Sequence, residues 1–166
     1  MKAALMWAVL GFPAATALAD TDVEFSGTLV ADPCQIEMDS LEQEINFGNI
    51  AAKTFINHNY SVAKSFSIHL TECDLSLGSQ VSVTFLGEED STHPGTLAVT
   101  GSAKGISIRM TDSEGRLVAP NQAQPVSGLH AGDTILEYQA RIEAQDFSQV
   151  SEGDFSAVTT FVLVWE

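Results

Sequence analysis

The sequence predicts an all-β sandwich, and three observations lead to that prediction. Runs of strand-forming residues recur along the chain, and turn-forming residues lie between them. Their spacing of about ten to fifteen residues suits short antiparallel strands rather than βαβ units. No internal repeat or interdomain linker interrupts the pattern. The runs cover residues 22–30, 44–50, 64–70, 80–86, 96–101, 105–111, 135–144 and 156–166.

Residues 1–19 are an expected secretory signal. Lys2 precedes a short apolar run, and Ala17-Leu18-Ala19 is a small-residue cleavage pattern. The apolar run is shorter than the roughly 20 residues that a bilayer-spanning helix needs, and no later stretch approaches that length. We therefore expect an exported, soluble chain that begins at Asp20.

The charge of the chain argues against several classes of partner. The full sequence has 7 Lys and Arg against 22 Asp and Glu, a formal net charge of -15. Lys2 is the only charged residue of the signal, so its removal leaves 6 against 22, or -16. Nucleic acid and anionic membrane surfaces are therefore poor partners. The remaining chain of about 150 residues is long enough for one domain with a substantial core.

The only two cysteines, Cys34 and Cys73, both follow the signal. Export brings thiols into an oxidising compartment, which predicts one disulfide between them. Closing a loop of about 40 residues stabilises a fold by roughly 4 kcal/mol in the chain-entropy model. A catalytic or metal role does not suit cysteines this far apart, with no CxxC motif and no adjacent histidine.

The first run, DVEFSGTLV at residues 22–30, has the pattern of a strand with one face to bury. Val23, Phe25 and Leu29 are apolar and alternate with polar residues. Gly27 falls on the same apolar face, where a missing side chain indicates close approach of another backbone. No strand precedes this run and no tight turn follows it, so its pairing partner is not evident from its neighbours.

The run at residues 135–144 is ambiguous between a helix and a strand. Leu136 and Ala140 lie four residues apart, as on one face of a helix. Tyr138, Arg141 and Ile142 interrupt that helical stripe. We therefore expect a strand, like the runs before it.

The last run, TTFVLVWE at residues 159–166, is almost continuously apolar, which predicts a strand buried on both faces. A first and a last strand that were both sheet edges would expose long apolar edges, which promote aggregation. We therefore expect another element to cover them.

Several motifs together resemble the pilin subunits of the bacterial chaperone-usher pathway. VEFSGTLV is followed by a cysteine in ADPCQI, by FGNI at residues 47–50 and by the second cysteine in KSFSIHLTEC. AKGISIRMTDSEG at residues 103–115 and Gly153, fourteenth from the end, complete a pattern that spans essentially the whole chain after the signal. Trp165 stands where the family usually has tyrosine.

The resemblance implies an immunoglobulin-like sandwich over residues 31–166 that lacks its last strand, preceded by a donor-strand extension over residues 20–30. A periplasmic chaperone lends a strand to the open groove, and at the outer-membrane usher the extension of the next subunit replaces it. Such β-augmentation satisfies the backbone of a sheet edge while alternate side chains fill pockets. The implied donor residues are Val23, Phe25, Gly27 and Leu29. The implied edge of the groove comprises Gly153, Phe161, Leu163, Trp165 and Glu166.

No motif indicates an enzyme, a cofactor or a metal site. The sequence contains no HxH, HExxH or GxSxG motif and no Cys–His pair. Acidic residues at 88–90 and 112–114 lie beside turn residues and are expected to form a solvated rim, with a weak calcium site as the alternative. The isolated histidines, expected at the surface or satisfied by hydrogen bonds, are His58, His69, His93 and His130.

The predicted function is that of a structural subunit of an adhesive pilus on the bacterial surface. DVEFSGTLV resembles the extension of minor or adaptor subunits of P-type or type 1-type pili. A chain terminator, whose groove accepts no further subunit, is the alternative within the family. A single-domain secreted adhesin would fold alone and contact a glycan or host protein through its turns. A small metalloenzyme such as a copper-zinc dismutase would need clustered histidines.

Overall fold

The computed structural model describes residues 23–29, 31–126 and 128–165, in two units that divide after Val30. The predicted signal, Asp20 and Glu166 lie outside the described residues. Within those residues, no helix is long and apolar enough to cross a membrane.

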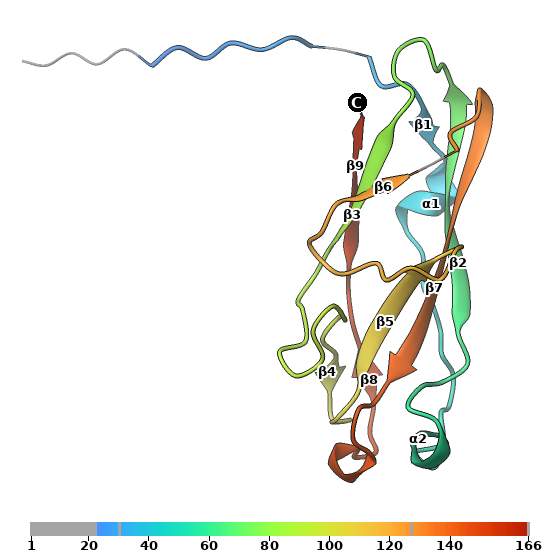
Figure 1. Ribbon diagram of the computed structural model, residues 1–166, viewed down its shortest axis with the longest axis vertical. Coiled ribbons are helices and arrows are strands. Elements are labelled where there is room, and N and C mark those ends of the chain that lie inside the picture. The colour runs from blue at the N-terminus through green and yellow to red at the C-terminus, as the bar shows by residue number, and fades with distance from the viewer. Residues whose placement is uncertain (1–22, 30, 127, 166) are drawn as a thin grey trace, which may run out of the picture. The chain divides into compact units, whose positions relative to one another are not determined.

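The unit that begins at Ala31 is all-β, as predicted, and consists mainly of two antiparallel sheets (Figure 1). The four-stranded sheet has the order β1-β2-β7-β5, and the three-stranded sheet has the order β6-β3-β9. Two short strands, β4 and β8, form a small third sheet. The strands are β1 Gln35–Ile36, β2 Lys64–Cys73, β3 Val81–Leu86, β4 Thr100–Gly101, β5 Ser107–Asp112, β6 Gln124–Val126, β7 Gly132–Glu143, β8 Phe155–Ser156 and β9 Thr160–Trp165. The helical turns are α1 Met38–Leu41, α2 Thr54–Asn57 and the 3-10 turn Phe147–Gln149.

The run at residues 135–144 is a strand, as predicted. It forms most of β7, the longest strand described, which pairs with β2 on one side and with β5 on the other. Leu136, Tyr138, Ala140 and Ile142 are all buried, so every second side chain faces the core. The period of two, set by the pleat of the sheet, therefore prevails over the local helical spacing of Leu136 and Ala140.

An aromatic cluster joins the two sheets at the centre of the core. The ring of Tyr138 in β7 lies 5.0 Å from that of Phe85 in β3 and 5.4 Å from that of Phe66 in β2, measured between centroids. Phe85 in turn lies 6.4 Å from Phe161 in β9. Burial, with a smaller effect from Asp112, raises the pKa of Tyr138 to about 12. Its phenol therefore stays neutral at physiological pH.

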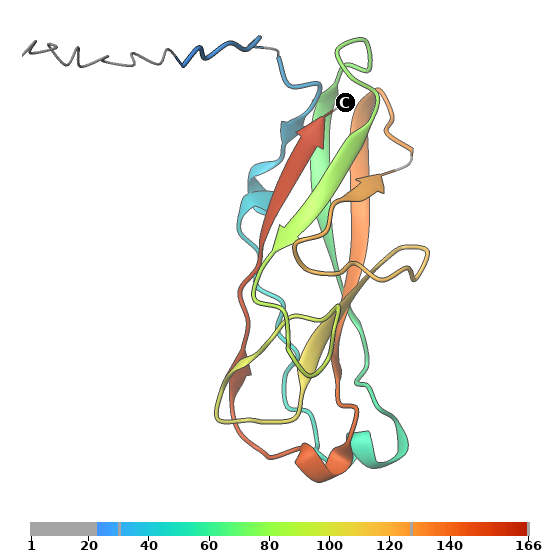
Figure 2. The same ribbon diagram turned by 60° about the vertical axis from the view of Figure 1, so that its left-hand side comes forward.

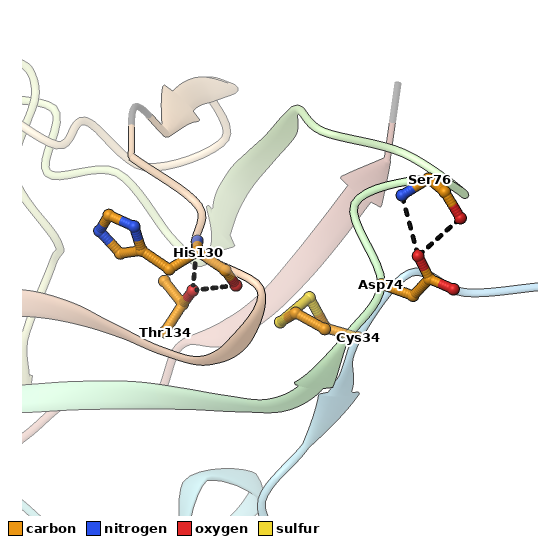
Figure 3. The surroundings of a disulfide bond; sticks show 6 residues. Cys34, Asp74, Ser76, His130 and Thr134 are labelled. Atoms are coloured by element: carbon orange, nitrogen blue, oxygen red, sulfur yellow. Dashed lines mark hydrogen bonds between the residues drawn. A yellow bond between two sulfur atoms is a disulfide. The ribbon is translucent and has the colours of Figure 1, made fainter.

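The predicted disulfide between Cys34 and Cys73 is present and ties β1 to the end of β2 (Figure 3). It continues a ladder in which Gln35 pairs with Thr71 and Ile36 pairs with Leu70. Beyond it, the backbone N–H of Asp74 donates to the carbonyl of Pro33 at 2.7 Å. The covalent bond therefore lies within a continuous pairing of the two segments and holds a very short strand in place.

Four predicted strands differ from the structure, and the first of them, at residues 22–30, forms no strand in its described part, residues 23–29. Residues 44–50 form no strand, the run at 96–101 contains only β4, and the last run is divided into β8 and β9. A strand requires hydrogen bonds to a neighbour, and residues 44–50 make no backbone–backbone hydrogen bond within the described chain. This strand-like segment therefore has no pairing partner among the described residues.

We expect loss of the disulfide to lower the free energy of unfolding by roughly 4 kcal/mol, because the two cysteines are 39 positions apart in the sequence and the reduced chain regains the freedom of that loop. Denaturant unfolding of the oxidised and reduced wild type measures this difference. The Cys34→Ala/Cys73→Ala variant is the control and should not respond to reductant. Equal unfolding midpoints for oxidised and reduced wild type would contradict the prediction.

Candidate functional site

The described part of the first unit, residues 23–29, exposes its apolar side chains. Phe25 is 92% exposed, Leu29 is 100% exposed and Val23 is 69% exposed. The segment has no helical or strand assignment. A β-carbon placed on Gly27 would have no atom within 4 Å. These exposed apolar side chains are available to another surface, where burial would be favourable.

Strand β9 has one paired edge and one unpaired edge. Its residues pair with β3 along its whole length, from Leu86–Thr160 to Val81–Trp165. On its other side, no strand of the described chain pairs with it. The backbone groups on that side are therefore open to an added strand.

The two faces of β9 differ, so the prediction of burial on both faces is wrong. Phe161, Leu163 and Trp165 are half-buried and pack against the core. Val162 and Val164 point the other way and are 39% and 52% exposed. The strand is continuously apolar, but only one of its faces is covered, because the three-stranded sheet has a layer on one side only.

A second apolar segment follows the same side of the domain as β8 and β9. This segment is the coil after α1, which runs alongside them in both views (Figures 1 and 2). Its Phe47 and Ile50 are half-buried against the core, and the ring of Phe47 lies 6.2 Å from that of Phe155 in β8. No backbone hydrogen bond joins residues 43–50 to β8 or β9. We call these apolar residues the β9 strip: Phe47, Ile50, Phe155, Phe161, Leu163 and Trp165.

The β9 strip leads into a cavity of about 210 Å³ beside β8, which we call the β8 cavity. Ile50 and Phe155 belong to both, so the cavity continues the strip at its β8 end. Apolar side chains dominate its lining, and it could receive a side chain inserted along the strip. Its principal lining residues are Ile50, Phe55, Ala103, Ile106, Ile142, Val150 and Phe155.

Gly153 also lines the β8 cavity, and there is no space for a side chain at this position. A β-carbon at this position would lie 2.5 Å from the backbone nitrogen of Ala103. The next carbonyl, that of Asp154, accepts hydrogen bonds from the N–H groups of Ser102 and Ala103 at 3.0 and 3.1 Å. Gly153 therefore lets the chain before β8 pack directly on the loop after β4.

The predicted groove residues and the predicted donor residues lie in different units of the chain. The structure places Phe161, Leu163 and Trp165 on the β9 strip and Gly153 at its cavity, while Val23, Phe25, Gly27 and Leu29 belong to the other unit. Glu166 lies outside the described residues. Sequence reasoning missed the roles of Phe47, Ile50 and Phe155. The FGNI motif contains Phe47 and Ile50, but no feature of the sequence indicated that these two residues would face β8.

The acidic rim takes part in structural hydrogen bonds. Asp90 accepts hydrogen bonds from the backbone of Thr92 and from Nδ1 of the buried His93. Burial alone would raise the pKa of Asp90, but the hydrogen bonds from Thr92 and His93 outweigh it and lower the pKa to about 2. Asp112 pairs with Arg116 at 2.7 Å. No group of three or more His, Cys, Asp or Glu in the described residues could hold a metal ion.

The sequence matches a protein family described as fimbrial protein over residues 23–165. It is 31% identical over 145 residues to the Fimbria A protein of Serratia marcescens, covering 87% of this chain and 83% of that protein. It is 33% identical over 153 residues to the PRS fimbrial major pilin protein of Escherichia coli, covering 87% and 93%.

Solved structures agree with this match. The P pilus rod subunit PapA superposes with a TM-score of 0.72 at 25% identity, covering 81% of this chain and 100% of that chain. The P pilus adaptor subunit PapF gives a TM-score of 0.52 at 13% identity, over 81% of this chain and 97% of that chain, a likeness of fold alone.

We expect the two faces of β9 to respond differently to charge. Phe161→Asp/Leu163→Asp would bury carboxylates in the β9 strip, at a cost of several kcal/mol to any strand that covers it. Val162→Asp/Val164→Asp adds the same charge on the outer face and is the matched control. The measurement is recovery of each variant with a coexpressed periplasmic pilus chaperone. Only the first variant should lose the complex, and equal recovery of both would contradict the assignment of the faces.

Proposed function

Because the chain belongs to the fimbrial protein family, as a pilin subunit of a surface pilus, we propose that it links to its neighbours by donor-strand exchange. Residues 20–30 of one copy insert beside β9 of another subunit and complete its sandwich. Residues 31–166 form the receiving domain, and residues 1–19 are removed on export.

The observation that supports this proposal is the presence of two complementary parts in one chain. Residues 23–29 expose alternating apolar side chains, and β9 exposes an unpaired backbone edge beside a strip of half-buried apolar side chains. An inserted strand would satisfy both, through backbone hydrogen bonds and through alternate side chains. Burial of Phe25 and of Leu29 would contribute roughly 1.5–3 kcal/mol each.

The donor residues are Val23, Phe25, Gly27 and Leu29, and the acceptor is the β9 strip with Gly153 and Glu166 at its ends. Val23, Phe25 and Leu29 supply the inserted side chains. Gly27 lies where the acceptor leaves no room for one. The polar residues that alternate with them stay on the outer face, as in an ordinary half-buried strand.

The open edge also explains the need for other partners before assembly. An unpaired apolar edge promotes aggregation, so a periplasmic chaperone covers it until the outer-membrane usher brings the next subunit. The chaperone and the donor strand use the same surface in turn. Neither step requires a cofactor or an inserted membrane segment.

Two observations bear on the place of the subunit in the fibre. The relatives named above as a major pilin and a rod subunit favour a repeating position over the minor or adaptor position that DVEFSGTLV indicates. The β8 cavity is open at the end of the β9 strip, which favours a subunit that accepts a neighbour over a chain terminator.

We expect Gly27→Leu to block donation without affecting the fold of the subunit that carries it. A peptide of residues 20–31 should displace chaperone from the subunit, and the Gly27→Leu peptide should do so at least about tenfold more slowly. The reason is overpacking of the acceptor core, at roughly 1–3 kcal/mol. Thr28→Leu, on the polar face of the same segment, is the matched control and should exchange at nearly the wild-type rate.

In the full chain, Gly27→Leu should leave expression and chaperone binding unchanged, because no described atom lies within 4 Å of the added β-carbon. Fibre assembly from this variant, followed by electron microscopy, should fail. Unfolding of the chaperone-bound variant, or unaltered peptide exchange, would show that the segment belongs to its own domain.

A further inference from the structure

Two arginines lie side by side on the outer face of the four-stranded sheet. Arg109 of β5 and Arg141 of β7 are direct cross-strand partners, and the residues that flank them, such as Ile108 and Ile142, are buried in the core. Like charges in this position are unfavourable. The carboxylate of Glu143 bridges the two guanidinium groups. It accepts hydrogen bonds from Nε of Arg109 and Nη2 of Arg141, each at 2.6 Å. One carboxylate pairs with two guanidinium groups, so this cluster of three side chains carries a net positive charge although the chain as a whole is strongly acidic.

Both guanidinium groups remain accessible from solvent. The side chains of Arg109 and Arg141 are 29% and 34% exposed. Within the described residues, Arg109 donates a hydrogen bond only through Nε. Its two terminal nitrogens can therefore donate to an acceptor on a bound ligand. Arg141 lies over the ring of Tyr60, with Cζ 4.5 Å from the ring centroid, and Tyr60 is itself 48% exposed. The cluster therefore combines oxyanion donors with a flat, partly apolar surface.

A polar hollow of about 250 Å³ lies on the same sheet, across β2 and β7, and its lining includes Gln139 but neither arginine. Gln139 in its lining is two residues from Arg141 on the same strand, so the two side chains share a face at about 7 Å spacing. No side chain among Ser65, Ser113, Glu137 and Gln139 makes a hydrogen bond within the described residues. The hollow thus offers hydroxyl, amide and carboxylate groups that have no other partner there. Its polar lining side chains are Ser65, Ser67, Ser113, Glu137 and Gln139.

We propose that this face binds an anionic saccharide, with a sugar ring in the hollow and its carboxylate or sulfate on Arg109 and Arg141. Hydroxyl and amide groups match the hydroxyls of a sugar, and a guanidinium pairs with a planar or tetrahedral oxyanion through two parallel hydrogen bonds. The net charge of the chain does not prevent this contact, because charges are screened beyond about 10 Å at 0.1 M salt.

This site goes beyond the proposed function and lies on a different surface from the β9 strip. Arg109 and Arg141 belong to β5 and β7, whereas the strip lies along β8, β9 and the coil after α1. A ligand on the four-stranded sheet therefore does not compete with donor-strand exchange. Each subunit of a fibre would carry one such site, and repetition along the fibre would raise the avidity for a surface with many saccharides.

The test measures saccharide binding to the full chain in its chaperone complex or in fibres, with chaperone alone as background. Sialyllactose and a sulfated disaccharide are the anionic probes, lactose is the neutral control and inorganic sulfate is the oxyanion control. Chemical-shift titration should show that the anionic saccharides bind at least about tenfold more tightly than lactose or sulfate alone. Higher salt should weaken that binding.

Arg109→Gln and Arg141→Gln should each reduce the affinity for the anionic probes at least about tenfold, and Gln139→Ala should reduce it with no change in thermal stability. Lys104→Gln, which removes a charge beside Gly101 at the end of β4, should change it less than about twofold. Three results would overturn the proposal: no binding of either anionic saccharide, binding no tighter than that of inorganic sulfate, or Arg109→Gln that lowers the melting temperature without changing affinity.

Discussion

The unpaired edge of β9 is the feature on which the rest of this structure depends. Backbone N–H and C=O groups beside an apolar surface must find hydrogen-bond partners, and water is a poor partner where the strip around them is half-buried. The sandwich buries Phe85, Tyr138 and their neighbours between its sheets, yet leaves Phe161, Leu163 and Trp165 only half-covered along this edge. The domain is stable enough to form a core and incomplete enough to require another chain.

The requirement for a missing strand accounts for two irregular features. Residues 44–50 have the composition of a strand but form none, because no described segment of the chain pairs with them. The gap between β8 and β9 lies on the same side, and the β8 cavity opens there. A segment inserted beside β9 would reach residues 44–50, the gap and the β8 cavity.

Local patterns predicted the longer strands whose partners lie within the chain, but not the short strands β1 and β6. Strands β2, β3, β5 and β7 follow from alternation because each pairs with a neighbour in its own sheet, and the disulfide follows from the presence of only two cysteines. Alternation did not predict that residues 44–50 would remain coil or that Val162 and Val164 would be exposed, because both outcomes depend on which other segments lie beside the strand. The pairing of Arg109 with Arg141 was equally hidden, since 31 residues separate them and only the register of β5 on β7 brings them together.

For subunits linked as proposed above, the disulfide has a mechanical consequence when the polymer is pulled along its length. Tension applied through residues 23–29 enters the domain three residues before Cys34, at a strand with only two paired residues. Without the covalent bond, the force would unzip β1 from β2 one residue at a time. With the covalent bond, the force passes from Cys34 through Cys73 to β2. All the hydrogen bonds between β2 and β7 then resist the force together in shear. A two-residue strand thus becomes a secure attachment point, so a pull on residues 23–29 would not unravel the domain to which they are joined.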